Sequence, residues 1–454
     1  MFEGLRDAFK LPDLRKRILL TFLILVVYRL AANIPVPGVD RDALQALLGG
    51  EGGLSQFANV LDLLSGGAVS NFSVLAMGVY PYITASIIIQ LLTPIVPALE
   101  ELAKEGQAGR DTMNRYTYFL AIPMSALQAI GQINIFGSAA LGGSSGIIPG
   151  FGAANPLITA TVIATMTAGT MFAIWLGELI TEQGIGNGLS LIIFAGIVAR
   201  VPTNFSRMMA DPTNRLRNII LFLALTLLTI LVIVVVQEGT RRIPVKYGKR
   251  VRGTKMYGGG SSYLPLRVNT AGMIPLIFAQ SILTFPAIVA NLFTQSSTAW
   301  LATFARSVSA IFSGSATLMG PQIVYWVIYF LLVVAFTYFY TDVMIRNQNL
   351  PENLQKNGGF IPGIRPGKRT AEFINRVVRR ITLVGALFLG GIAVLPGVIS
   401  ITLQMTGGAG GQTFARNLLL ISGGSLIIVV GVVIDTLRQL EAQLVMRHRD
   451  AFIK

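Results

Sequence analysis

The segment from Asn218 to Val236 reads Asn-Ile-Ile-Leu-Phe-Leu-Ala-Leu-Thr-Leu-Leu-Thr-Ile-Leu-Val-Ile-Val-Val-Val and contains no charged side chain. A helix needs roughly 20 apolar residues to cross a bilayer, so this segment predicts a transmembrane helix. Nine further segments have the same character, and the sequence therefore predicts an all-α membrane protein with ten transmembrane helices. The ten segments lie at about 18–34, 76–95, 116–136, 154–176, 187–200, 218–236, 270–291, 321–341, 381–400 and 417–434.

The overall composition excludes several other classes of protein. Of the 454 residues, 53% are apolar and only 13% are charged, whereas a soluble protein carries about 25% charged residues. A single-domain soluble enzyme, a disordered chain and a fibrous chain are thereby excluded. The chain has no cysteine and one histidine, which excludes thiolate or histidine metal clusters and cysteine nucleophiles. We therefore predict no catalytic residue, no metal and no cofactor.

The basic residues are distributed unevenly between the two sides of the membrane. If the N-terminus is cytoplasmic, the cytoplasmic segments hold 28 of the 36 lysines and arginines, the opposite side holds 7, and Arg29 lies within the first span. Cytoplasmic loops collect Lys and Arg. The sequence therefore predicts that both termini are cytoplasmic.

One apolar segment between the first two spans is too short to cross the membrane. It runs Phe57-Ala-Asn-Val-Leu-Asp-Leu-Leu-Ser-Gly-Gly-Ala-Val, and such segments re-enter the membrane or lie at its interface. Non-helical backbone is tolerated at membrane depth where protein covers it or where it lines an aqueous cavity. The segment indicates a pore, although a simple interfacial loop remains an alternative.

The spans themselves contain almost no ionisable side chains. Arg29 and Glu178 are the exceptions, and both lie near span ends. Ion-coupled transporters hold acids or histidines within their spans, so a channel is favoured over a secondary transporter for a small solute, which stays the alternative.

Two long loops, 237–269 and 342–380, each hold eight lysines and arginines, with Gly258-Gly259-Gly260 in the first and Gly358-Gly359, Pro362-Gly363 and Pro366-Gly367 in the second. Loops of this size and charge are typical of protrusions that bind a large anionic partner, such as ribosomal RNA or an acidic motor protein.

Five stretches, in this order along the chain, resemble the bacterial SecY protein-translocation channel family. They are Pro81-Tyr-Ile-Thr-Ala-Ser-Ile-Ile-Ile-Gln, Gly184-Ile-Gly-Asn-Gly, Arg241-Arg-Ile-Pro-Val-Lys-Tyr-Gly-Lys-Arg, Leu264-Pro-Leu-Arg-Val-Asn-Thr-Ala-Gly-Met-Ile-Pro and Gly359-Phe-Ile-Pro-Gly-Ile-Arg-Pro-Gly. The resemblance implies two inverted five-helix halves around an hourglass pore, here 1–210 and 211–454. It also implies a re-entrant plug helix at about 57–72.

The resemblance further implies a ring of aliphatic side chains at the waist of the pore. Val79 and Ile83 are four residues apart and share one helix face. A narrow apolar ring dewets and blocks ions, and it makes no sequence-specific contact with a polypeptide. The implied ring residues are Val79, Ile83, Ile193, Ile277 and Ile428, and the implied plug residues are Leu61, Leu63, Leu64, Ser65, Gly66 and Gly67.

A lateral gate toward lipid and a cytoplasmic docking surface are implied as well. The gate side chains would be Thr84 and Gln90 on the second span, facing Asn269 and Phe285 on the seventh. Polar pairs of this kind contribute about 0.6–2 kcal/mol, weak enough for an apolar helix to displace them. The implied docking residues for the SecA motor and the ribosome are Arg241, Arg242, Lys249, Arg250 and Arg365.

The resemblance implies a function and a set of partners. The chain would be the protein-conducting channel of the Sec translocon in the bacterial plasma membrane. It would pass unfolded secretory polypeptides across and release signal sequences and transmembrane segments laterally into the lipid bilayer. Implied partners are SecE-type and SecG-type small membrane subunits, the SecA ATPase, the ribosome, and the signal sequences and nascent polypeptides themselves.

Overall fold

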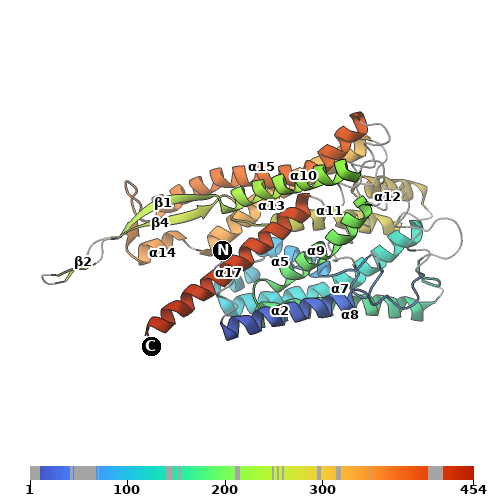
Figure 1. Cartoon of the computed structure of the whole chain (residues 1–454), viewed down its shortest axis with the longest axis horizontal. Helices are drawn as coiled ribbons and strands as arrows, with labels where there is room; N and C mark the ends of the chain where they lie inside the picture. The colour runs from blue at the N-terminus through green and yellow to red at the C-terminus, as the bar shows by residue number, and fades with distance from the viewer. Residues whose placement is uncertain are drawn as a thin grey trace.

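The computed structural model describes most of the chain and is predominantly helical (Figure 1). The described residues are 11–40, 44, 68–69, 71–139, 147–151, 155–209, 215–247, 250–252, 255–257, 260–293, 298–312, 319–348, 350–406 and 423–453. The helices are α2 (Pro12–Ala31), α5 (Tyr80–Leu92), α6 (Pro97–Lys104), α7 (Gln107–Ala139), α8 (Pro156–Gln183), α9 (Gly188–Met209), α10 (Arg215–Glu238), α11 (Ile274–Phe293), α12 (Ala299–Phe312), α13 (Met319–Gln348), α14 (Leu350–Lys356), α15 (Lys368–Thr406) and α17 (Gly423–Ile453).

Each of the ten predicted segments overlaps one of these helices. Proline stands at the first or second position of α2, α5, α6 and α8, where its missing N–H costs no helical hydrogen bond. The second predicted span ends at a sharp bend of 103° between α5 and α6. Pro94 and Pro97 lie at this break, and proline has no N–H to continue a helix.

Fewer described helices than the ten predicted spans meet the length and hydropathy that a membrane crossing requires. By length and hydropathy, three described helical stretches can cross a membrane, namely Pro156–Gln183, Gly320–Lys356 and Lys368–Ile399, or four if the bent pair α5–α6 forms one span. Four further apolar helical stretches among the described residues are shorter, namely Gly188–Ala199, Phe222–Glu238, Ile274–Ala287 and Ala299–Phe312. The count of ten therefore stays a prediction.

The helices lie in two groups (Figure 1). Helices α2, α7 and α8 run side by side along one edge of the molecule, and α10, α13 and α15 run along the other. Helix α11 contacts α5 and α7, and α9 contacts α10 and α17, so these helices join the two groups. The largest core cluster lies where they meet.

The all-α prediction is incomplete for the two long basic loops, whose described residues form two small antiparallel sheets. β1 (Thr240–Tyr247) pairs with β4 (Ser261–Arg267) and β5 (Gly359–Phe360), while β2 (Arg250–Arg252) pairs with β3 (Lys255–Tyr257). Ile243 and Val245 of β1 are buried while their neighbours are exposed, the alternation of a half-buried strand. The high charge and turn content of the loops had concealed this short period-two pattern.

Candidate functional site

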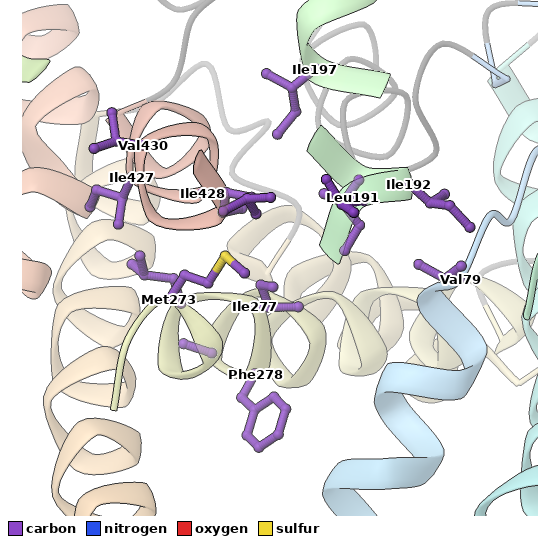
Figure 2. Packing of buried hydrophobic residues seen from close by; sticks show 14 of the residues in the cluster. Val79, Leu191, Ile192, Ile197, Met273, Ile277, Phe278, Ile427, Ile428 and Val430 are labelled. Carbon is purple, nitrogen blue, oxygen red and sulfur yellow. The ribbon is translucent and has the colours of Figure 1, made fainter. Parts of the chain in front are cut away.

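The largest apolar cluster extends through α2, α5, α8, α9, α10, α11, α13, α15 and α17. Val79, Ile193, Ile277 and Ile428 belong to this cluster, and each is at most 7% exposed. Figure 2 shows Ile277 of α11 next to Ile428 of α17, with Leu191 of α9 nearby and Val79, at the start of α5, beside Ile192. Four segments far apart in the sequence thus contribute aliphatic side chains to one core cluster.

The remaining predicted ring residue also contacts this cluster. Ile83 is partly buried and packs against it, one helical turn beyond Val79, whose carbonyl accepts the Ile83 N–H at 3.2 Å. The structure therefore brings all five predicted ring residues to one cluster, and whether they form the narrowest ring stays a prediction.

Sequence reasoning missed other members of this cluster. Leu191, Ile192 and Met273 are each at most 8% exposed and lie among the predicted residues. Consecutive aliphatic residues such as Leu191 and Ile192 point in different directions from a helix. The sequence does not indicate which of the two side chains faces the cluster, because this depends on how α9 packs against its neighbours.

A buried polar contact joins α5 to α11. The Tyr80 hydroxyl donates a hydrogen bond of 2.8 Å to the main-chain carbonyl of Ser281. Tyr80 is 6% exposed, and Ser281 is fully buried. Neither residue carries a signal in the sequence that marks this contact, although Tyr80 directly follows Val79 in the second predicted span.

The predicted gate residues make mainly local contacts. Thr84 is buried and accepts a hydrogen bond of 3.2 Å from Gln128 Nε2 of α7, while its own hydroxyl donates to the Tyr80 carbonyl. Gln90 Nε2 donates to Ser86 Oγ within α5, and Asn269 Nδ2 donates to the Gly272 carbonyl ahead of α11. Phe285 is half-buried in α11. Among the described contacts, it is Tyr80 that reaches across from α5 to α11.

The sheet formed by β4, β1 and β5, here called the basic sheet, combines exposed arginines with buried apolar side chains. Arg241 and Arg242 are exposed on β1, and Ile243 packs into a small core with Leu266 and Ile361. Lys249 lies outside the described residues, and Arg250 begins β2. The sheet is therefore a supported platform rather than an unstructured loop.

Arg365 lies in the tight turn between β5 and α15. It is exposed, and its carbonyl accepts a hydrogen bond of 3.0 Å from the Thr370 hydroxyl. Gly363 and Gly367 flank it with φ of 82° and 104°, values that favour glycine. The turn therefore holds Arg365 at a defined place.

Charged side chains also connect the end of strand β4 and the end of α10 to α17. Arg438 of α17 forms an ion pair of 2.8 Å with Glu238 at the end of α10. Desolvation and then the Arg438 guanidinium lower the pKa of Arg267, the last residue of β4, while Asp435 and Glu238 act in the opposite direction. The four charges thus form one interacting cluster, defined by Glu238, Arg267, Asp435 and Arg438.

The predicted plug residues Leu61, Leu63, Leu64, Ser65, Gly66 and Gly67 lie outside the described residues. The residues that follow them, Ala68, Val69 and Phe72, are fully buried. No group of three or more His, Asp or Glu side chains that could hold a metal ion occurs among the described residues.

Comparisons with known proteins identify similar chains over nearly the full length. A family model described as SecY matches residues 73–437. The protein translocase subunit SecY of Thermotoga maritima is 40% identical over 461 residues, which cover all of this chain and 98% of the relative. A solved structure concerned with the plug domain of the SecY protein has a TM-score of 0.61 at 17% identity, covering 94% of this chain and 92% of that one. Sec61 in the canine ribosome–channel complex has a TM-score of 0.57 at 18% identity, with the same two coverages.

Proposed function

Because this chain belongs to the SecY family of protein translocase subunits, we propose that the five predicted ring residues within its largest apolar cluster form the waist of a protein-conducting channel. The chain passes unfolded secretory polypeptides across a membrane and releases signal sequences and transmembrane segments laterally into the lipid. The relatives that match its whole length are protein translocase subunits, and they lend no support to the alternative of a small-solute transporter.

The convergence of Val79, Ile83, Ile193, Ile277 and Ile428 is the observation that carries this assignment. Aliphatic side chains offer no hydrogen bond to water or ions, so a narrow constriction made of them dewets when empty. They also make no contact that depends on the sequence of a passing chain. A ring of this kind seals against ions and still accepts polypeptides of any sequence.

We assign the two groups of helices in Figure 1 to the two halves of the channel, 1–210 and 211–454. The ten-span topology, the inverted relation of the halves and the cytoplasmic position of both termini belong to this proposal. They are supported by the overlap of every predicted span with a helix and by the concentration of basic residues in the cytoplasmic segments. We place the chain in the bacterial plasma membrane.

Two moving parts complete the proposal. The segment 57–72 acts as the plug, and the boundary between α5 and α11 acts as the lateral gate. The contact between these two helices supports the gate. The buried position of Ala68, Val69 and Phe72 supports a plug held close to the protein interior.

The basic sheet and the Arg365 turn are the docking surface in this proposal. Exposed arginines on a supported sheet suit rRNA phosphates and acidic protein surfaces. The structural similarity to Sec61 in a ribosome–channel complex supports the ribosome as a partner. We assign the SecA motor to the same surface and small SecE-type and SecG-type subunits to the membrane part.

A photocrosslinking experiment tests the waist. A photoreactive amino acid at Ile83 or Ile193 should crosslink to a secretory polypeptide arrested in transit through the channel in native membranes. The matched control is Leu231 of α10, which is 61% exposed and should crosslink to lipid. Equal polypeptide crosslinking from Leu231 and Ile193, or none from Ile83 and Ile193, would contradict the assignment.

A further inference from the structure

We propose that Tyr80 is a positioning residue whose hydroxyl latches α5 to α11 and thereby sets how apolar a segment must be to open this boundary. The inference rests on the proposed function, because it concerns regulation of the lateral gate. It adds a residue that the comparison of motifs did not indicate.

The Tyr80 contact is the described hydrogen bond that joins the two helices directly. Its donor lies in the first turn of α5, its acceptor is the Ser281 carbonyl in the middle of α11, and the two residues are 201 positions apart. Thr284, one turn further along α11, is 2% exposed and also interacts with the Tyr80 hydroxyl. The bond is shielded from water, so separating the helices leaves a phenol and a carbonyl without partners until water or lipid headgroups reach them.

The acceptor lies in a weakened part of α11. Pro286 lies inside this helix, and because proline has no N–H, the carbonyl of Ile282 lacks its usual helical partner. Helices bend at such positions. Tyr80 therefore binds α11 one residue before the point where the helix bends most readily.

The donor, in contrast, is firmly held. Thr84 donates to the Tyr80 carbonyl at 3.1 Å and accepts from Gln128 of α7. Gln128 is 2% exposed, so α5 is joined to α7 through a second buried polar contact. When the boundary opens, we therefore expect α11 to move while α5, which carries Tyr80, stays in contact with α7.

The Ser281 side chain on the α11 side is fully buried, and its hydroxyl also lies beside the Tyr80 hydroxyl. An inserting apolar segment must break the Tyr80 bond and gains only the burial of its own side chains. A long apolar segment offsets this cost, and a weakly apolar segment does not.

The test compares Tyr80→Phe with Tyr82→Phe, which removes a hydroxyl from the same helix. Tyr82 packs against Tyr118 with ring centroids 5.5 Å apart. Import of preproteins with strong and weak signal sequences is measured in proteoliposomes that contain the complete translocon and its motor. We expect Tyr80→Phe to raise import of the weak-signal preprotein about threefold to tenfold, since one buried hydrogen bond is lost. Strong-signal import should stay near wild type, and Tyr82→Phe should match wild type for both.

A spectroscopic measurement tests the contact between α5 and α11 independently of protein import. Because the chain has no cysteine, spin labels at Leu92→Cys of α5 and Thr270→Cys ahead of α11 report the distance between the helices. Tyr80→Phe should broaden this distance distribution in the absence of any substrate.

Two results overturn the latch. One is an unchanged ratio of weak-signal to strong-signal import in Tyr80→Phe together with an unchanged distance distribution. The other is an equal effect of Tyr82→Phe, which would indicate general loosening of α5. Failure of wild-type protein to import even the strong-signal preprotein would instead refute the proposed function.

Discussion

A Cβ atom added to Gly397 of α15 would lie 2.1 Å from Cε2 of Trp326 in α13. The indole ring therefore occupies the space that any larger residue at position 397 would need. Small residues at helix contacts allow close approach in membranes, where no hydrophobic effect drives helices together. Gly397 thus lets α13 and α15 approach closely at Trp326.

We predict that Gly397→Ala destabilises the protein by about 1–3 kcal/mol, the usual cost of overpacking. Gly391→Ala on the same helix is the matched control, because an added Cβ there meets nothing within 4 Å. Alanine also forms helix more readily than glycine, by about 0.5–1 kcal/mol. Thermal unfolding in detergent checks both variants, and a Gly391→Ala loss as large as that of Gly397→Ala would contradict the packing argument.

We predict that Ile428→Asn makes the resting channel leak ions. An amide in the apolar cluster binds water and opposes dewetting, and a barrier lower by about 1.4 kcal/mol gives about tenfold higher conductance. Planar-bilayer recording measures this conductance. Val433→Asn on the exposed side of the same helix should leave it unchanged, and equal leakage from both variants would remove Ile428 from the waist.

We predict that Arg365→Glu abolishes motor-driven import while membrane insertion and thermal stability stay at wild-type values. The side chain is exposed and its turn is held by main-chain geometry, so the fold does not depend on its charge. Loss of a binding hot spot costs about 2 kcal/mol or more. The control is Arg376→Glu, another exposed arginine, on α15; import at the wild-type rate by Arg365→Glu would refute its docking role.

We predict a measurable coupling between Glu238 and Arg438. Either single charge reversal, Glu238→Arg or Arg438→Glu, should lower stability, and the double reversal should restore most of the loss. The pair is partly exposed, at 46% and 23% of the side-chain surface, so the coupling should amount to about 0.2–1 kcal/mol.

High salt should weaken this coupling because it screens exposed charges. A double-mutant cycle of thermal midpoints measures it. Glu441→Arg, an exposed charge reversal on the same helix, serves as the control and should show no coupling to position 238.

The positions of the helices were predictable because apolar runs and their charged ends are local features. The run Asn218–Val236 lies within α10, and the proline-rich end of the second predicted span coincides with the bend after Leu92. The strand Thr240–Tyr247 was not predicted, because its partners Ser261–Arg267 and Gly359–Phe360 come from distant parts of the chain. Strand pairing is a tertiary property, whereas hydropathy belongs to each segment alone.

By itself, the sequence indicated that this chain enters a membrane, placed an apolar segment within or across each of ten helices, and showed that its basic residues concentrate in two loops. These properties depend on the transfer of each segment from water to lipid, which needs no knowledge of neighbouring segments. The tertiary structure decided which side of each helix faces the centre. Leu191 joined Ile428 in the apolar cluster, and Tyr80 rather than Thr84 reached Ser281, because contacts between helices follow from packing and not from the composition of any one segment.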